Sequence, residues 1–236
     1  MTIGIVGGMG SWATVDFFRR IIAAFPAQKE WERPRVLIDN YCTMPSRVRA
    51  ILYDEKKEEL IADLSASVQN LIRAGADRIV LACNTSHAFL ADVQKNVPES
   101  RGLMIDLIRE CALHTSGKGQ NVFLIASEGT IAAGIYQNIF DEYGIPIENP
   151  TEDDQVQIRD FIEAVKQDQI DDAVLRKFVQ FLDGGRCETV ILGCTEIPVL
   201  HSMCVNRGYQ SQKTVIDPLQ CVIDRLVKER AESAPV

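Results

Sequence analysis

The sequence predicts an α/β protein of two similar domains, each a parallel sheet flanked by helices. Short apolar strand patterns alternate with amphipathic helical patterns along the whole chain. The strand, turn and helix at the N-terminus are echoed from residue 122 onwards. A strand that ends at Cys83 is echoed by another that ends at Cys194. Because no low-complexity linker separates the two halves, we expect them to pack closely.

The first half reads as three strand and helix units. Its apolar strand patterns lie at residues 3–6, 35–38 and 78–82. Helical patterns follow them at residues 11–26, 56–74 and 83–98. Gly75 stands where a glycine commonly ends a helix, and residues 41–47 read as a loop. Strands that alternate with helices in this way are typical of a parallel sheet covered on both faces.

The second half repeats the alternation. Strands are expected at residues 104–105, 122–126, 189–193 and 215–216. Helices are expected at residues 107–114, 131–143, 151–166, 172–183 and 219–230. We expect the last helix to return to the first half. The predicted domains are therefore residues 1–100 plus 215–236, and residues 101–214.

Composition excludes several classes of partner. The 236 residues are 46% hydrophobic and 25% charged, with a mean hydropathy of -0.02, as in ordinary soluble globular proteins. A net charge of -8 argues against nucleic acid or an anionic membrane surface as partner. We expect neither a membrane span nor a signal peptide. The seven cysteines include no C-x-x-C pair, so reduced thiols in the cytoplasm are expected.

Two cysteines stand where chemistry is expected. In open parallel sheets, ligands bind outside the carboxyl ends of the strands, and Cys83 and Cys194 both occupy such a position. A helix N-terminus at that place favours a thiolate. The neighbouring Asn84, Thr85 and Thr195 can hydrogen-bond a carboxylate bound at the same amides. A single buried cysteine is usually a small apolar core residue, but two at matching strand ends favour a functional pair.

The sequence also contains features of other kinds of site. Cys83 and His87 are spaced to share a helix face, but no further pair completes a zinc site, so no metal is expected. The turn Gly8-x-Gly10-x-x-Ala13, with Asp39 ending the next strand, is typical of an NAD(P)-binding oxidoreductase. That alternative leaves both cysteine units without a role. A non-catalytic module that closes on an anion stays open as well.

Six motifs in order resemble the aspartate/glutamate racemase family, and most closely its aspartate racemases. They extend from the first strand to Ile216-Asp217-Pro218, nearly the whole chain. The motifs are Gly7-Gly8-Met9-Gly10 with Ala13-Thr14, Pro45-x-Arg47, Cys83-Asn84-Thr85-x-His87, Pro150-Thr151-Glu152-Asp153, Lys166, and Gly193-Cys194-Thr195-Glu196.

The resemblance implies an active site in the cleft between two α/β domains, an acidic amino acid as substrate, and a homodimer. It implies neither pyridoxal phosphate nor any other cofactor. Cys83 and Cys194 become the paired acid and base. The residues that it assigns to substrate binding are Met9, Arg47, Asn84, Thr85, Thr130, Lys166 and Thr195. Of these, Arg47 and Lys166 would hold the side-chain carboxylate, and Asn84 and the threonines the α-carboxylate and the amine.

The implied reaction explains why two thiols are needed. Inversion of a stereocentre through a planar carbanion requires a base on one face and an acid on the other. Hydrogen bonds to the developing enediolate compensate for the weak acidity of the α-hydrogen. Ser46 stands where the family often has an aspartate residue beside the arginine. This difference leaves open whether the substrate is aspartate or glutamate. A related isomerase of unsaturated diacids would use the same scaffold.

Overall fold

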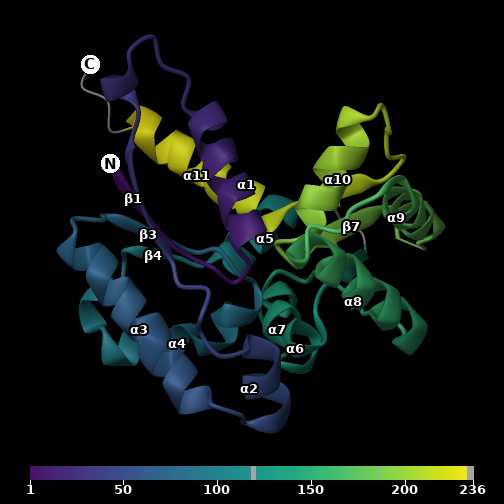
Figure 1. Cartoon of the computed structure of the whole chain (residues 1–236), viewed down its shortest axis with the longest axis horizontal. Helices are drawn as coiled ribbons and strands as arrows, with labels where there is room; N and C mark the ends of the chain where they lie inside the picture. Colours follow the sequence, from purple (N-terminus) through teal and green to yellow (C-terminus); the bar gives the residue numbers. More distant parts are fainter. Residues whose placement is uncertain (118–120, 186, 233–236) are drawn as a thin grey trace.

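The chain forms two four-stranded parallel sheets, as the sequence predicts (Figure 1). The computed structural model describes residues 1–117, 121–185 and 187–232. The first sheet has the order β2-β1-β3-β4 and the second the order β6-β5-β7-β8. The strands of the first sheet are β1 (Thr2–Gly7), β2 (Arg35–Asn40), β3 (Arg78–Leu81) and β4 (Met104–Ile105). Those of the second are β5 (Val122–Ile125), β6 (Ile147–Glu148), β7 (Thr189–Leu192) and β8 (Thr214–Ile216).

Helices cover both faces of each sheet. Those of the first half are α1 (Ser11–Ala24), α2 (Arg47–Tyr53), α3 (Lys57–Arg73), α4 (Leu90–Asn96) and α5 (Leu107–Thr115). The others are α6 (Glu128–Ala132), α7 (Ile135–Glu142), α8 (Glu152–Lys166), α9 (Asp172–Gly184), α10 (Ile197–Asn206) and α11 (Pro218–Glu232). Short 3-10 helices lie at η1 (Glu30–Glu32), η2 (Thr85–Phe89) and η3 (Pro98–Ser100). Among the described residues, no helix is long and apolar enough to cross a bilayer.

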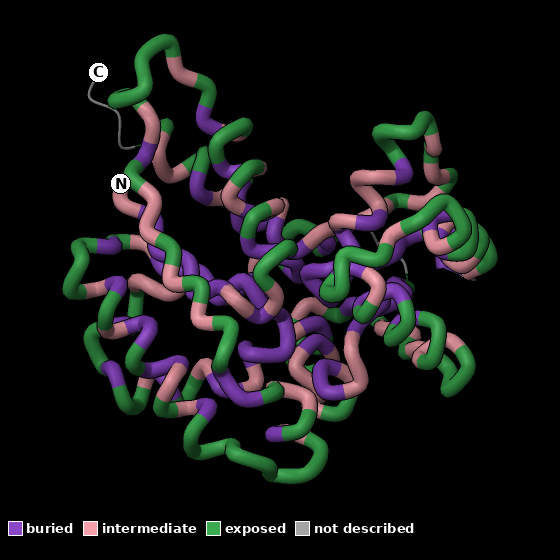
Figure 2. The backbone as a smooth tube through the Cα atoms, in the orientation of Figure 1, coloured by how far each residue is buried: buried purple, intermediate pink, exposed green. Residues whose placement is uncertain are grey.

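One hydrophobic cluster joins the two sheets. Alternate residues of each central strand point to opposite faces of its sheet. On the face that is turned toward the other sheet, Val80 of β3 and Ile191 of β7 belong to this shared cluster. Helices α1, α5, α7 and α11 supply the layer between the sheets. The outer faces have their own clusters, one under α3 and α4 and one under α8, α9 and α10. Figure 2 shows buried segments gathered in the region where the halves meet.

The strand pairing divides the chain differently from the expected ranges. Met104–Ile105 pairs with β3 of the first sheet, although it lies after residue 100. Strand β8 pairs with β7 of the second sheet, although residues 215–216 of this strand were expected in the first domain. Helix α11 then packs against α1 and α5, next to the first sheet. Residues 118–120, 186 and 233–236 of the expected ranges lie outside the described residues.

One local prediction is wrong for an identifiable reason, and one short helix was not predicted. The helix expected over residues 131–143 is two helices, because Gly134 adopts a left-handed conformation with φ +62° between α6 and α7. The segment read as a loop ends in the short helix α2. Its N-terminus is capped by the Ser46 hydroxyl, which accepts from the Arg49 amide at 3.4 Å.

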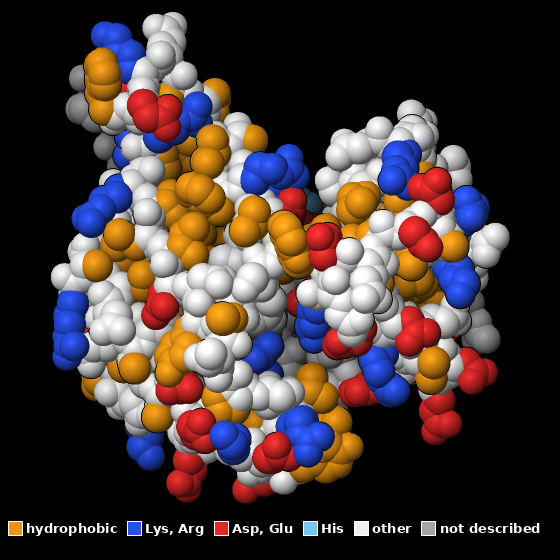
Figure 3. Space-filling model, in the orientation of Figure 1, with side chains coloured by type: hydrophobic (Ala, Val, Ile, Leu, Met, Phe, Trp, Pro, Cys, Tyr) orange, Lys and Arg blue, Asp and Glu red, His pale blue; other side chains and the backbone are white. Residues whose placement is uncertain are grey.

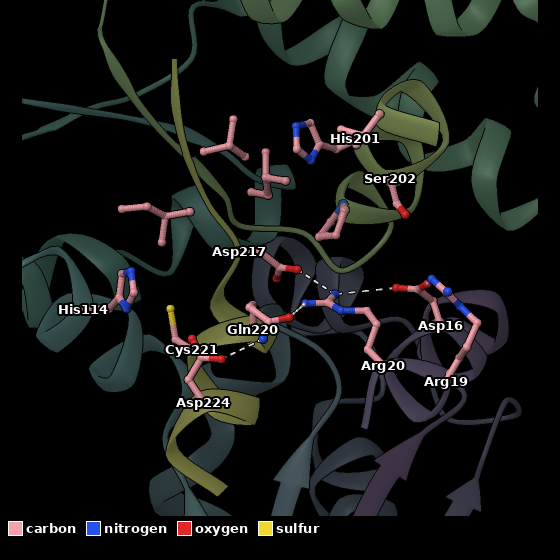
Figure 4. A pocket seen from close by; sticks show the side chains of 15 residues that line it. Asp16, Arg19, Arg20, His114, His201, Ser202, Asp217, Gln220, Cys221 and Asp224 are labelled. Atoms are coloured by element: carbon pink, nitrogen blue, oxygen red, sulfur yellow. Dashed lines mark hydrogen bonds and ion pairs between the residues drawn. The ribbon is translucent and has the colours of Figure 1, made fainter. Parts of the chain in front are cut away.

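A cavity of about 380 Å³ lies where α1, α10 and the start of α11 meet (Figure 4). Neither Cys83 nor Cys194 lines it. Arg20 of α1 crosses this junction, forming an ion pair with Asp217 at 2.6 Å and donating a hydrogen bond to Gln220 at 3.0 Å. Burial raises the pKa of Asp217, and the positive charge of Arg20 opposes that rise. Arg20 therefore ties the N-terminal helix to the C-terminal one.

Replacing Arg20 with methionine should lower the free energy of unfolding by about 2–3 kcal/mol, because the half-buried Asp217 carboxylate loses its charge partner. Arg19→Met is the matched control, since Arg19 forms an exposed ion pair with Asp16 that should contribute below about 1 kcal/mol. Urea unfolding of both variants measures the difference. Equal losses in the two would contradict this role for Arg20.

Candidate active site

Cys83 and Cys194 follow equivalent strands of the two sheets. Cys83 lies two residues after the end of β3, and Cys194 lies two residues after the end of β7. Both are buried free thiols. Because β3 and β7 hold the same place in their sheets, the two thiols approach from opposite halves. Figure 3 shows a hollow in the molecular surface between these halves.

A buried carboxylate accompanies Cys194. The thiol donates to Glu196 Oε2 at 3.0 Å, and the Thr195 hydroxyl donates to the same oxygen at 3.2 Å. Burial raises the pKa of the Cys194 thiol well above its ordinary value, and the negative charge and hydrogen bond of Glu196 raise it further. Lys166 opposes this effect with its positive charge. Cys194 is consequently a protonated thiol at neutral pH.

Lys166 reaches this group from the end of α8. Its ammonium lies 3.2 Å from Glu163 at the surface. Burial lowers the pKa of Lys166, but the neighbouring acidic groups, Glu196 first, outweigh this effect, so that the pKa is raised. Lys166 is therefore a permanent cation beside the Cys194 thiol.

Three hydroxyl groups converge near the end of β3. The Thr85 hydroxyl is hydrogen-bonded to Thr130 at 2.9 Å and to Ser127 at 3.0 Å, and the last two lie 3.1 Å apart. Ser127 caps α6 and Thr130 lies within it, whereas Thr85 begins η2 of the first half. The triangle thus joins the two halves through groups that can each donate or accept.

Asn84 has one satisfied and one unsatisfied polar atom. The Tyr136 hydroxyl donates to Asn84 Oδ1 at 2.6 Å, whereas the buried Nδ2 has no partner in the structure. Burial raises the pKa of Tyr136 well above its ordinary value, so that its hydroxyl keeps its proton. An acceptor at Oδ1 leaves Nδ2 as a donor for an anion.

Arg47 lies at the first turn of α2 and is held against the glycine-rich turn. Its guanidinium donates to the carbonyls of Pro45 at 3.2 Å and Met9 at 3.3 Å. The Met9 side chain is buried and its sulfur accepts from the Ser86 hydroxyl at 3.0 Å. Met9 therefore contributes an anchor for Arg47 through its backbone.

The glycine-rich turn is filled by the protein's own atoms. A Cβ at Gly8, which has φ +82°, would lie 2.6 Å from the backbone of Tyr41 and Cys42. A Cβ at Gly10 would lie 3.1 Å from Glu196 Oε1. A carboxylate beside the turn repels a pyrophosphate, which counts against the dinucleotide alternative.

Both ring nitrogens of His87 are committed to the backbone. The Leu107 amide donates to Nε2 at 3.4 Å, so Nδ1 carries the proton and donates to the Cys83 carbonyl at 2.9 Å. Burial lowers the pKa of His87, which keeps the ring neutral. His87 thus fixes the backbone of Cys83. The described residues contain no group of three or more His, Cys, Asp or Glu side chains that could hold a metal ion.

The comparisons agree with this arrangement. The model of the Asp/Glu/hydantoin racemase family matches residues 6–226. The chain belongs to the Asp/Glu/hydantoin racemase family. This match confirms the resemblance that the sequence motifs indicated. Because racemases are isomerases, the chain is an enzyme of the isomerase class.

Individual relatives are distant. The broad specificity amino-acid racemase RacX of Bacillus subtilis (strain 168) is 24% identical over 229 residues, covering 93% of this chain and 94% of RacX. A glutamate racemase of Lactobacillus acidophilus is 27% identical over 70% of this chain and 61% of its own length. The solved aspartate racemase of Picrophilus torridus has a TM-score of 0.78 at 24% identity, covering 98% of this chain and 94% of that one. This solved structure confirms the predicted fold of two α/β domains.

Three polar residues of the site were not among the predicted ones. Ser127 follows β5 as Cys83 follows β3, which is a signal that the sequence contains. Glu196 lies two residues after Cys194, within a motif already singled out. Tyr136 carries no such signal, because its bond to Asn84 exists only in the folded chain.

Tyr136→Phe should lower kcat/KM for amino-acid racemisation by about tenfold, because the Asn84 amide loses the bond that orients it. Tyr143→Phe is the matched control, since its hydroxyl accepts only a long 3.4 Å bond from Arg109 outside the site. Steady-state kinetics of both variants measure the effect. An unchanged kcat/KM in Tyr136→Phe would show that Asn84 is oriented by other contacts.

Proposed function

We propose that the chain racemises an acidic amino acid, aspartate first and glutamate second, without a cofactor, and that Cys83 and Cys194 are its paired acid and base. The observation that carries the proposal is their equivalent position after β3 and β7, where both are buried. The family membership supports the reaction class. The names of the relatives, aspartate and glutamate racemases, support an acidic substrate.

The proposed reaction moves one proton off and one proton on. A thiolate removes the α-hydrogen from one face, and the electron pair of the broken C–H bond delocalises into the carboxylate. The opposite thiol gives its proton to the other face and becomes the thiolate. In one direction Cys83 is the base and Cys194, whose pKa is raised by burial, is the acid. The reverse reaction exchanges these roles.

The developing enediolate needs donors that are already in place. The Thr85, Ser127 and Thr130 hydroxyls and the unpartnered Asn84 Nδ2 surround the end of β3. Such preorganised donors stabilise charge that grows in the transition state. We assign the α-carboxylate to this group, with Thr195 on the opposite side next to Cys194.

The side-chain carboxylate is assigned to the two cations. Arg47 offers a planar guanidinium that is held by two carbonyls, and Lys166 offers a point charge beside Cys194. A homodimer and a cytoplasmic location belong to the same proposal. The seven unpaired cysteines support the reducing compartment.

Cys83→Ser and Cys194→Ser should each lower kcat for racemisation by about 100-fold or more, because a hydroxyl is a far weaker base and acid partner than a thiol. Cys42→Ser, at an exposed cysteine, is the control and should keep full activity. Chiral chromatography of L- and D-aspartate after incubation measures the rate. Near-normal racemisation in either active-site variant would contradict the two-thiol proposal.

Lys166→Met should raise KM for aspartate by about tenfold or more, because the side-chain carboxylate loses a charge partner. Lys57→Met, which removes an exposed lysine paired with Asp54, is the matched control. Steady-state kinetics with aspartate and glutamate measure both variants. An unchanged KM in Lys166→Met would remove Lys166 from the substrate site.

A further inference from the structure

Two buried polar atoms without a partner lie at the strand ends that carry the cysteines. One is the donor Asn84 Nδ2 after β3, and the other is the acceptor Glu196 Oε1 after β7. Glu196 is only 2% exposed. Because a buried carboxylate oxygen without a donor is costly, its persistence beside a reactive group points to a donor brought by a ligand.

The carboxylate of Glu196 is held in a way that leaves this oxygen free for a ligand. Oε2 accepts from the Cys194 thiol at 3.0 Å and from the Thr195 hydroxyl at 3.2 Å. Oε1 faces the glycine-rich turn, where a Cβ at Gly10 would lie 3.1 Å away. The absence of a side chain at Gly10 therefore preserves the space around Oε1.

The groups assigned to substrate binding include no anion for the ammonium group of an amino acid. Arg47 and Lys166 are cations for carboxylates, and the asparagine and the hydroxyls are neutral. An α-amino acid also carries an ammonium group, which needs an anion when it leaves water. Glu196 supplies a carboxylate, which accepts from the Cys194 thiol at 3.0 Å and whose charge raises the pKa of Lys166.

We propose that Glu196 Oε1 accepts a hydrogen bond from the α-ammonium group of the substrate. The proposal rests on the proposed function and names the group that selects amino acids. A simple diacid brings its two carboxylates without the cation that offsets the charge of Glu196, and is therefore disfavoured. The residue thereby separates an amino-acid racemase from an isomerase of simple diacids on the same scaffold.

The same contact affects proton transfer. The negative charge of Glu196 helps to keep the Cys194 thiol protonated in the free enzyme. A bound ammonium offsets that charge, so the thiol gives up its proton more readily once an amino acid is in place. Glu196 thus couples recognition of the ammonium to the acidity of Cys194.

Calorimetric titration with DL-aspartate and with succinate tests the proposal. Succinate has both carboxylates but lacks the ammonium, and turnover leaves the composition of DL-aspartate unchanged. The variants are Glu196→Gln, which keeps the shape and removes the charge, and the matched control Glu163→Gln, whose carboxylate pairs with the same Lys166 at the surface. Gly10→Ala is a second variant, which crowds Oε1 without changing any charge.

Glu196→Gln should weaken DL-aspartate binding by about 10- to 100-fold, as expected for a charged hydrogen bond, with succinate binding unchanged or tighter. Gly10→Ala should show the same selectivity, and Glu163→Gln should bind both ligands as the wild type does. Equal weakening of both ligands, or unaltered aspartate binding in Glu196→Gln, overturns the proposal. If Glu196→Gln does not fold, the selectivity of Gly10→Ala decides. A wild type that binds neither aspartate nor glutamate overturns the proposed function itself, and the ammonium site with it.

Discussion

The position of both cysteines depends on the hydrophobic core that the two sheets share. Val80, three residues before Cys83, and Ile191, three residues before Cys194, are buried in the same cluster. A close-packed interior resists displacement, so the separation of the two strand ends is set by the side chains between the sheets. Helices α5 and α11 fill that layer, and Arg20 fixes α11 to α1 at its edge.

Polar groups at the two strand ends are different although the strands are equivalent. Cys83 is held through its carbonyl by neutral His87, and hydroxyls from both halves surround the neighbouring Thr85. Cys194 is buried, and two charged residues act on its thiol. Glu196 raises the pKa of the thiol, and Lys166 lowers it. The symmetric scaffold therefore carries an asymmetric charge pattern, which suits a reaction that begins with one thiol protonated.

Strand periodicity was sufficient to predict the two parallel sheets and the place of both cysteines. It failed where a single backbone conformation decides the outcome, as at Gly134, which splits a continuous helical pattern. It also failed at strand membership, since Met104–Ile105 joins the first sheet by tertiary pairing alone. The same limit applies to the site. Tyr136 meets Asn84 across 52 residues of chain, and no local pattern encodes that hydrogen bond.

The central claim is that two thiols act on opposite faces of one carbon. The fate of the α-hydrogen in the first turnovers tests it most directly, with L-aspartate and wild-type enzyme in heavy water and mass spectrometry of the separated enantiomers. Two opposed thiols predict that the D-aspartate formed carries deuterium from the start while the remaining L-aspartate still carries hydrogen. Product that retains hydrogen, or deuterium that enters both enantiomers equally at early times, would mean that one base serves both faces and would contradict the account.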